Sequence, residues 1–463
     1  MTQILKFWLS IATLLTGLAS SSVPSAAQSA NPPLGNVPDP QIAAALKDVS
    51  PQRIQASIEK LVSFYTRSSL SGQDPNLVNA GRGIAAARQW IVAELERYSK
   101  ECGGCLDVET YRFVEPPGKR VPNLTEMTDV YAVLKGSDPA GAKRMVLVTG
   151  HYDSRNSDVM DAAGFAPGAN DDASGTAVSL ECARVLSKMK FPVTIVFLAV
   201  AGEEQGLIGS RHFAEMAKER GWNLEAVLNN DIVGGDNNPA QDRSLVRVFS
   251  EGIPLAAKEQ DLRRLRTLGG EDDSGSRELA RYIGEIAHAY EAGVKPMLVF
   301  RLDRYERGGD HESFNEQGFA AVRFTEFRED FHHQHQNPRN EDGVEYGDLP
   351  KFVDYDYVAR VARLNAATLA ALAMAPAPPA HVHFPRGLAS DSTLIWDASP
   401  GGLATAYEIV WRATTSPEWE HQLRVGNVTR ATLQMSRDEV IFGVRAIDAA
   451  GHRSLPVVPA PEP

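Results

Sequence analysis

Histidine and acidic residues follow apolar runs of this chain in a fixed order, and their types are those that hold metal ions. In chain order they are His151-Tyr152-Asp153, Asn170-Asp171-Asp172, Glu203-Glu204, Asp231, and a late histidine cluster around His333. Imidazole and carboxylate groups bind zinc, and a catalytic zinc site keeps a position open for water. One bridging carboxylate with one histidine and one acidic ligand on each side would hold two metals. The pattern therefore indicates metal-assisted hydrolysis.

The apolar runs explain how these residues could meet. Runs at 145–149, 193–200 and 225–229 directly precede His151, the Glu203-Glu204 pair and Asp231. Continuous apolar runs are typical of strands buried on both faces. Open α/β sheets bind ligands at the carboxyl ends of their strands. We therefore expect three strands to bring these side chains to one edge of a sheet.

The rest of residues 45–375 alternates between strand-like and helix-like segments. Further strands are expected at 106–113, 129–135, 296–302 and 320–325, and helices at 51–66, 78–99, 174–189, 209–220, 276–291 and 355–374. This alternation predicts an α/β fold, a mainly parallel mixed sheet with helices on both faces. Ser174 is expected to cap its helix. Specificity pockets are expected from loops such as 154–168 and 236–275.

A second domain is predicted after this one. Residues 376–380 form a Pro/Ala linker, and residues 381–463 change to period-two alternation with turn residues between the runs. This pattern predicts a small all-β sandwich. Three motifs resemble a fibronectin type III domain over residues 381–456: Leu394-Ile395-Trp396, Tyr407-Glu408-Ile409-Val410-Trp411-Arg412, and Val444-Arg445-Ala446-Ile447-Asp448-Ala449-Ala450-Gly451.

The N-terminus predicts export. Lys6, the apolar run 7–19 and Ser25-Ala26-Ala27 together read as a signal peptide over residues 1–27, too short in its apolar part to span a membrane. A flexible segment over 28–44 should follow, and the mature protein should be secreted or periplasmic. In an exported chain Cys102 and Cys105 could form a small disulfide loop.

The net charge of the chain limits the kinds of molecule that it could bind. The net charge of −12 argues against nucleic acid or an anionic membrane as the main partner. The apolar share of 43% and charged share of 23% are those of a globular protein with ample core. A peptide or protein substrate is compatible with both, and no segment of the mature chain reads as a membrane span.

Over roughly residues 45–375 the chain resembles the M28 family of zinc metallopeptidases, which are exopeptidases with two zinc ions on a phosphorylase/hydrolase-like fold. The resemblance rests on five motifs: Gly150-His151-Tyr152-Asp153-Ser154, Gly168-Ala169-Asn170-Asp171-Asp172-Ala173-Ser174-Gly175, Gly202-Glu203-Glu204-Gln205-Gly206-Leu207-Ile208-Gly209-Ser210, Asn230-Asp231 and Asp310-His311-Glu312-Ser313-Phe314.

The resemblance implies a role for each matching residue. His151 and Asp231 would bind one zinc, Glu204 the other, and Asp171 would bridge both. Glu203 would be the general base. Asp153 would orient His151, as carboxylates commonly do beside metal-bound imidazole. Asp172 would help to form the backbone turn beside the bridge.

The last zinc ligand is a choice among neighbouring histidines. The family pattern has a histidine with an aspartate four residues later, and this spacing favours His333, with Asn337 in the aspartate position. His335 remains an alternative. His311 is expected to order the pocket and not to bind metal. The residue before the last ligand is an aromatic with a hydroxyl in several relatives, and here it is His332, which leaves the oxyanion donor open.

The leading functional prediction is an exported zinc aminopeptidase that hydrolyses peptide bonds at free N-termini. A carboxypeptidase or dipeptidase would use the same metal core with a different pocket. Glutaminyl cyclisation belongs to similar folds and is disfavoured by the complete ligand set. A non-catalytic adhesion or binding protein is the alternative from another class. The C-terminal domain is expected to contact polymeric or surface-bound substrate, or to act as a spacer.

Overall fold

The computed structural model describes residues 35–461, which lie within one compact unit. The predicted signal peptide lies outside the described residues. The segment predicted to be flexible ends in a helix, α1 (Pro40–Ala45), which is capped by Asp39 and buries Ile42 completely. Among the described residues, no helix is both long and apolar enough to cross a membrane.

The larger part is built on an eight-stranded mixed sheet with the order β1-β2-β4-β3-β5-β8-β6-β7. The central strands β4, β3, β5 and β8 run parallel to one another. At one edge, β2 pairs antiparallel with β4, and β1 pairs antiparallel with β2. At the other edge, β6 pairs antiparallel with β8 and parallel with β7. The strands are β1 (Leu106–Glu115), β2 (Thr125–Leu134), β3 (Arg144–His151), β4 (Thr194–Val200), β5 (Asn223–Asn230), β6 (Leu245–Ser250), β7 (Lys295–Val299) and β8 (Ala321–Glu326).

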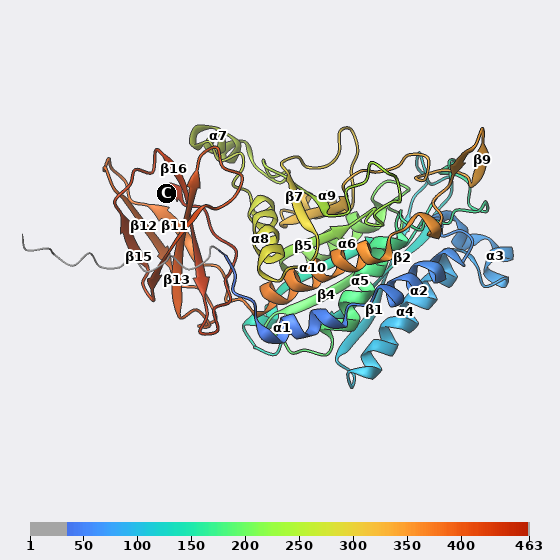
Figure 1. Cartoon of the computed structure of the whole chain (residues 1–463), viewed down its shortest axis with the longest axis horizontal. Coiled ribbons are helices and arrows are strands. Elements are labelled where there is room, and N and C mark those ends of the chain that lie inside the picture. The colour runs from blue at the N-terminus through green and yellow to red at the C-terminus, as the bar shows by residue number, and fades with distance from the viewer. Residues whose placement is uncertain (1–34, 462–463) are drawn as a thin grey trace, which may run out of the picture. The chain divides into compact units, whose positions relative to one another are not determined.

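Helices cover both faces of this sheet, and Figure 1 shows α5 and α10 lying side by side across its middle. The larger core cluster joins one face to α2, α4, α5, α8 and α10, and the smaller joins the other face to α6 and α9. The helices are α2 (Pro51–Val62), α3 (Pro75–Asn79), α4 (Gly83–Glu101), α5 (Ala173–Leu186), α6 (Ile208–Glu219), α7 (Glu259–Leu268), α8 (Gly275–Ala289), α9 (His311–Glu316) and α10 (Tyr355–Met374).

Strand β3 shows why the predicted runs are apolar throughout. Val146 and Val148 pack into the larger core cluster, whereas Leu147 between them packs into the smaller one. Successive side chains of a strand point to opposite faces, so a strand covered on both faces needs apolar residues at every position. The α/β fold predicted from the sequence is confirmed.

The C-terminal part is a β-sandwich of a four-stranded sheet, β15-β12-β11-β17, and a three-stranded sheet, β14-β13-β16. Trp396, Tyr407, Ile409, Phe442 and Val444 fill its core. The strands are β11 (Ala380–Phe384), β12 (Ser392–Asp397), β13 (Ala406–Ala413), β14 (His421–Gly426), β15 (Arg430–Leu433), β16 (Val440–Ile447) and β17 (Ala460–Pro461). A short hairpin, β9 (Arg339–Glu341) and β10 (Val344–Tyr346), belongs to the larger part.

The linker between the two parts is anchored. The guanidinium of Arg144 donates hydrogen bonds to the carbonyl oxygens of Ala375 (2.9 Å) and Pro376 (3.2 Å), and it also pairs with Glu225. Because Ala375 and Ala377 are buried as well, the chain leaves α10 along a defined path into β11.

Polar and charged contacts join the sandwich to α8. Arg445 is fully buried and pairs with Glu285 (2.8 Å) and with Glu408 of its own sheet (2.7 Å). The indole nitrogen of Trp419 donates to Glu278 (2.9 Å), and the hydroxyl of Tyr282 donates to a backbone carbonyl of the sandwich. The sandwich is therefore not held by the linker alone.

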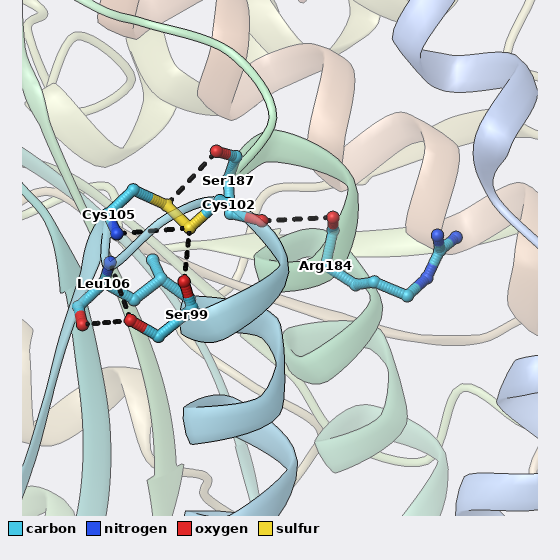
Figure 2. Close-up of a disulfide and its surroundings, with 6 residues drawn as sticks. All are labelled: Ser99, Cys102, Cys105, Leu106, Arg184 and Ser187. Carbon is cyan, nitrogen blue, oxygen red and sulfur yellow. Dashed lines mark hydrogen bonds between the residues drawn. A yellow bond between two sulfur atoms is a disulfide. The ribbon is translucent and has the colours of Figure 1, made fainter.

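Cys102 and Cys105 form a disulfide between the end of α4 and the start of β1 (Figure 2). The backbone amide of Cys105 lies 3.2 Å from the sulfur of Cys102, and the sulfur of Cys105 lies 3.2 Å from the carbonyl oxygen of Ser187, just after α5. The loop thus sits against the C-terminal end of a core helix. Cys182 is a buried free thiol, as its place in an apolar stripe predicts.

Two regions differ from the sequence expectations. Helix α5 begins at Ala173, so Asp172 and not Ser174 is its N-cap. Residues 236–275, expected to be a loop, contain the whole of β6 and α7. Helix α7 buries none of its side chains, and β6 is a strand of only six residues.

Candidate metal centre

The candidate site lies at the carboxyl ends of three neighbouring parallel strands. His151 is the last residue of β3, Asp231 follows β5 directly, and Glu203 and Glu204 follow β4 after a turn at Gly202. Gly202 has a positive φ of 76°, which lets the chain leave the strand sharply. Because β4, β3 and β5 are adjacent in the sheet, these residues meet at one edge as predicted.

Two groups of three side chains form there. His151, Glu203 and Asp231 make one group, and Asp171, Glu204 and His335 make the other; within each group the possible ligand atoms all lie within 4.8 Å of one another. Nε2 of His151 lies 3.1 Å from Oδ1 of Asp171, which joins the two groups. Asp171 therefore lies between the two groups, where its carboxylate could be shared.

The carboxylate of Asp171 also faces the second group. Its Oδ2 atom lies 2.8 Å from Nε2 of His335, and that nitrogen is 3.3 Å from Oε1 of Glu204. The side-chain amide of Gln334 donates to the same Oδ2 atom (3.0 Å). One oxygen of Asp171 thus points to each group.

His333, predicted as the last ligand, is not part of either group; it lies instead with Asp236 and Asp330. Its Nδ1 atom lies 2.6 Å from Oδ2 of Asp236, and its ring stacks on Phe352 with centroids 3.6 Å apart. His335, the alternative, lies with Asp171 and Glu204 in the second group and has a positive φ of 54°. The four-residue spacing between His333 and Asn337 favoured His333, but Asn337 does not support a histidine of either group. Its side-chain oxygen accepts hydrogen bonds from Ser157.

Asp172 organises the backbone around the bridge. The peptide bond between Asp171 and Asp172 is cis. The carboxylate of Asp172 accepts hydrogen bonds from the backbone amides of His151 (3.0 Å), Gly175 (2.9 Å) and Ile232 (3.3 Å). It therefore connects the ends of β3 and β5 with the first turn of α5.

Asp153 supports both sides of the centre. Its Oδ1 atom lies 3.3 Å from Nδ1 of His151, without the alignment of a hydrogen bond. The same carboxylate accepts the backbone amides of Glu203 (3.3 Å) and Glu204 (3.2 Å) and the hydroxyl of Ser69 (3.2 Å). It fixes the turn that carries the two glutamates.

Sequence reasoning missed several supporting residues. Arg323, fully buried on β8, lies 3.1 Å from Asp231 and 3.1 Å from Asp303. In the sequence, Arg323 could have been noticed as a charged residue within the mainly apolar run 320–325. Asp348 accepts the backbone amides of Asn170 and Asp171, both at 2.7 Å. Nothing in the sequence around Asp348 points to that contact.

His311 lies apart from these two groups, near Asp303 and Glu312. Its Nε2 atom is 2.8 Å from the carbonyl oxygen of Leu302, and burial lowers its pKa. Asp310, just before it, is fully buried with no hydrogen-bond partner for either carboxylate oxygen, and burial raises its pKa to about 7.

The donor set fits zinc. Both ring nitrogens of His151 and Oε1 of Glu204 are buried without hydrogen-bond partners, and buried polar atoms are otherwise almost always paired. Histidine nitrogen and carboxylate oxygen are common zinc ligands. Four carboxylates lie in the two groups, a concentration of negative charge that bound cations would balance.

The electrostatics of the centre follow from burial and crowding. Burial raises the pKa of Glu203 well above its usual value, and the neighbouring acids Asp231 and Glu204 add to this. Burial alone would lower the pKa of His335, but Glu204 and Asp171 raise it to about 10. Strongly shifted groups gathered in a cleft are typical of functional sites.

A cavity of about 560 Å³ opens over the centre. Residues of both candidate groups form its floor, and Leu207, Ile232 and Phe331 supply apolar wall. Phe331 is 64% exposed. The volume is in the range of pockets that bind a small molecule or a few residues of a peptide.

Comparison with known proteins agrees with this geometry. The model of "Peptidase family M28" matches residues 129–351, a range that contains both candidate groups. A "Probable zinc metalloprotease" of Pyrenophora teres f. teres is 44% identical over 430 residues, 92% of this chain and 88% of that protein. One from Pyricularia oryzae is 45% identical over 445 residues, 93% and 87% of the two chains.

Solved structures share the fold. LapA from Legionella has a TM-score of 0.51 at 21% identity, over 72% of this chain and 76% of that one. LapB from Legionella pneumophila also has a TM-score of 0.51, at 19% identity, over 72% and 74% of the two chains. At these identities the likeness concerns the fold.

Proposed function

Since the chain belongs to peptidase family M28 and is a zinc metallopeptidase, we propose that it is an exported exopeptidase with two zinc ions that hydrolyses peptide bonds at free N-termini. The observation that carries the proposal is the pair of three-residue groups joined through Asp171. His151 and Asp231 would hold one ion, Glu204 and His335 the other, and Asp171 both.

When bound, zinc would lower the pKa of the attacking water and polarise the scissile carbonyl. A carboxylate oxygen of Glu203 accepts the proton of that water and returns it to the nitrogen of the leaving amine. Oε2 of Glu203 lies 4.0 Å from Nε2 of His151, and the residue lines the cavity. Asp153 holds the backbone of this base through its amide.

The preference for free N-termini rests on the floor of the cavity. Carboxylates of Glu203, Glu204, Asp171 and Asp231 line it, and a substrate ammonium could donate hydrogen bonds to the carboxylate oxygens that bound zinc leaves free. A carboxypeptidase or dipeptidase would instead bind a terminal carboxylate, and the arginine side chains on the cavity wall keep this alternative worth testing. Export and a substrate-reaching role for the sandwich remain parts of the proposal that rest on sequence.

The test is hydrolysis of aminoacyl p-nitroanilides against the same compounds with N-acetyl groups, together with metal analysis. We expect cleavage of the free-amine substrates alone, loss with a chelator and recovery with zinc. Glu203→Gln should keep its zinc and lose several orders of magnitude in kcat. Cleavage of only the blocked substrates would overturn the aminopeptidase assignment, and near-normal turnover of Glu203→Gln would remove Glu203 from the role of base.

A further inference from the structure

The wall of the cavity carries an excess of arginine. Outside the candidate metal groups, the charged side chains that line it are those of Arg120, Arg155, Arg304, Arg307 and a single acid, Glu306. If two zinc ions balance the four carboxylates of the floor, as the proposed function requires, these arginines dominate the charge of the remaining surface.

Acidic side chains of the protein form ion pairs with only some of these arginines. Arg304 and Arg307 both pair with Glu329, at 2.9 and 2.7 Å. Arg247 pairs with the same carboxylate at 2.9 Å, so one acid serves three guanidinium groups. Arg304 also contacts Asp303, which Arg323 shares.

Arg155 and Arg120 have no carboxylate within 4 Å among the described residues. Backbone carbonyls hold both: Arg155 donates to Asn156 (3.0 Å) and Ser157 (3.1 Å), and Arg120 donates to Glu204 (3.0 Å). Arg155 is half-buried. These contacts keep the guanidinium groups at the cavity while several of their N–H donors and the positive charge stay available, which suits a carboxylate ligand.

We propose that Arg155, with Arg120, binds a carboxylate of the substrate, so that the preferred substrates are short acidic peptides. The proposal deepens and rests on the proposed peptidase function. The carboxylate has two sources: the side chain of an N-terminal glutamate or aspartate, or the α-carboxylate of a di- or tripeptide. In both, the ammonium would face the carboxylate oxygens at the metal centre and the substrate carboxylate would face the arginine side chains.

Paired substrates separate the two sources. For the side chain, glutamyl p-nitroanilide is compared with glutaminyl p-nitroanilide, which has the same shape without the charge. For the α-carboxylate, leucyl-glycine is compared with leucyl-glycinamide. We expect the charged member of at least one pair to have a kcat/KM about 10- to 100-fold higher, a ratio that falls with added salt.

Substitutions of Arg155 and Arg120 test whether these side chains cause the preference for the charged substrate. Arg155→Met should lower the charged-to-neutral ratio by about tenfold or more, and Arg155→Lys should restore part of it because the charge returns without the bidentate geometry. Arg120→Met should lower the ratio as well. Arg53→Met, an exposed arginine of α2 outside the cavity, is the matched control and should leave the ratio unchanged.

Binding provides a readout that does not depend on turnover. Calorimetric titration of the zinc-loaded protein with glutarate and with its monoamide glutaramate should show tighter binding of glutarate, and Arg155→Met should abolish the difference. Equal affinities together with equal rates within both substrate pairs would overturn the inference, even for an active aminopeptidase. Preferential glutarate binding that needs Arg155 in a protein without peptidase activity would support the carboxylate site and refute the proposed function.

Discussion

Nε2 of His335 lies 2.8 Å from Oδ2 of Asp171, whereas the neighbouring His333 turns to Asp236 instead. The two histidines are two positions apart in the chain, yet one faces the metal centre and the other the aromatic ring of Phe352. This arrangement completes the second group of ligands and makes the assignment directly testable.

His335→Ala should lose roughly one equivalent of zinc per chain and nearly all activity, because the second group then has only carboxylates. The matched variant is His333→Gln, which removes an imidazole outside both groups and should keep its zinc. Elemental analysis after dialysis, with rates on a p-nitroanilide, measures both. Full zinc content in His335→Ala would contradict the assignment.

Asp153→Asn should weaken zinc binding by about 10- to 100-fold, because carboxylates beside a metal-bound histidine support its orientation and basicity. Asparagine offers only one acceptor oxygen, while the Asp153 carboxylate accepts from Glu203, Glu204 and Ser69. Competition with a fluorescent zinc chelator gives the affinity. Asp107→Asn, at an exposed position of β1, is the control, and equal affinities of the two variants would exclude the supporting role.

Arg445→Ala should destabilise the protein by about 3 kcal/mol, because it removes the partner of Glu285 and one of the partners of the buried Glu408, which keeps Arg453 at 3.1 Å. Arg445 is fully buried between Glu285 of α8 and Glu408 of the sandwich. Chemical denaturation measures the free energy of unfolding. Arg430→Ala, exposed on β15, should change it by less than about 0.5 kcal/mol; a similarly small loss for Arg445→Ala would show that the contact between the parts is dispensable.

His452 should make stability depend on pH. Hydrogen bonds to Asp448 (2.7 Å) and to Asp39 before α1 (3.1 Å) raise its pKa above 6.5. A raised histidine pKa stabilises the fold below the unfolded value, and the gain is lost as pH rises through the folded pKa. Replacing the imidazole should therefore cost on the order of 1 kcal/mol near pH 5.5 and little near pH 8.5.

The measurement for this histidine is the unfolding free energy of the native protein and of His452→Gln at both pH values. His381→Gln is the control, since His381 pairs with Asp397 at an exposed position where solvent screens the charges. A cost of His452→Gln that is the same at both pH values would show that protonation plays no part.

The sequence alone was sufficient for the α/β core and for the prediction that most residues of the candidate site lie together. His151, Glu203, Glu204 and Asp231 follow apolar strands, and the carboxyl ends of parallel strands meet at one edge whatever the surrounding loops do. The apolar pattern also separated the sandwich from the peptidase part, although it gave no sign of the buried pairs that join them, such as Arg445 with Glu285.

Only the tertiary structure decided which histidine completes the centre. His333 and His335 share one irregular segment, where no helical or strand period sets the direction of a side chain, and a positive φ at His335 turns its ring toward Asp171. The same holds for Arg155 and Arg120, which belong to two separate loops and both line the cavity. Strand ends are set by local pattern, whereas loop side chains are placed by contacts between segments far apart in the chain.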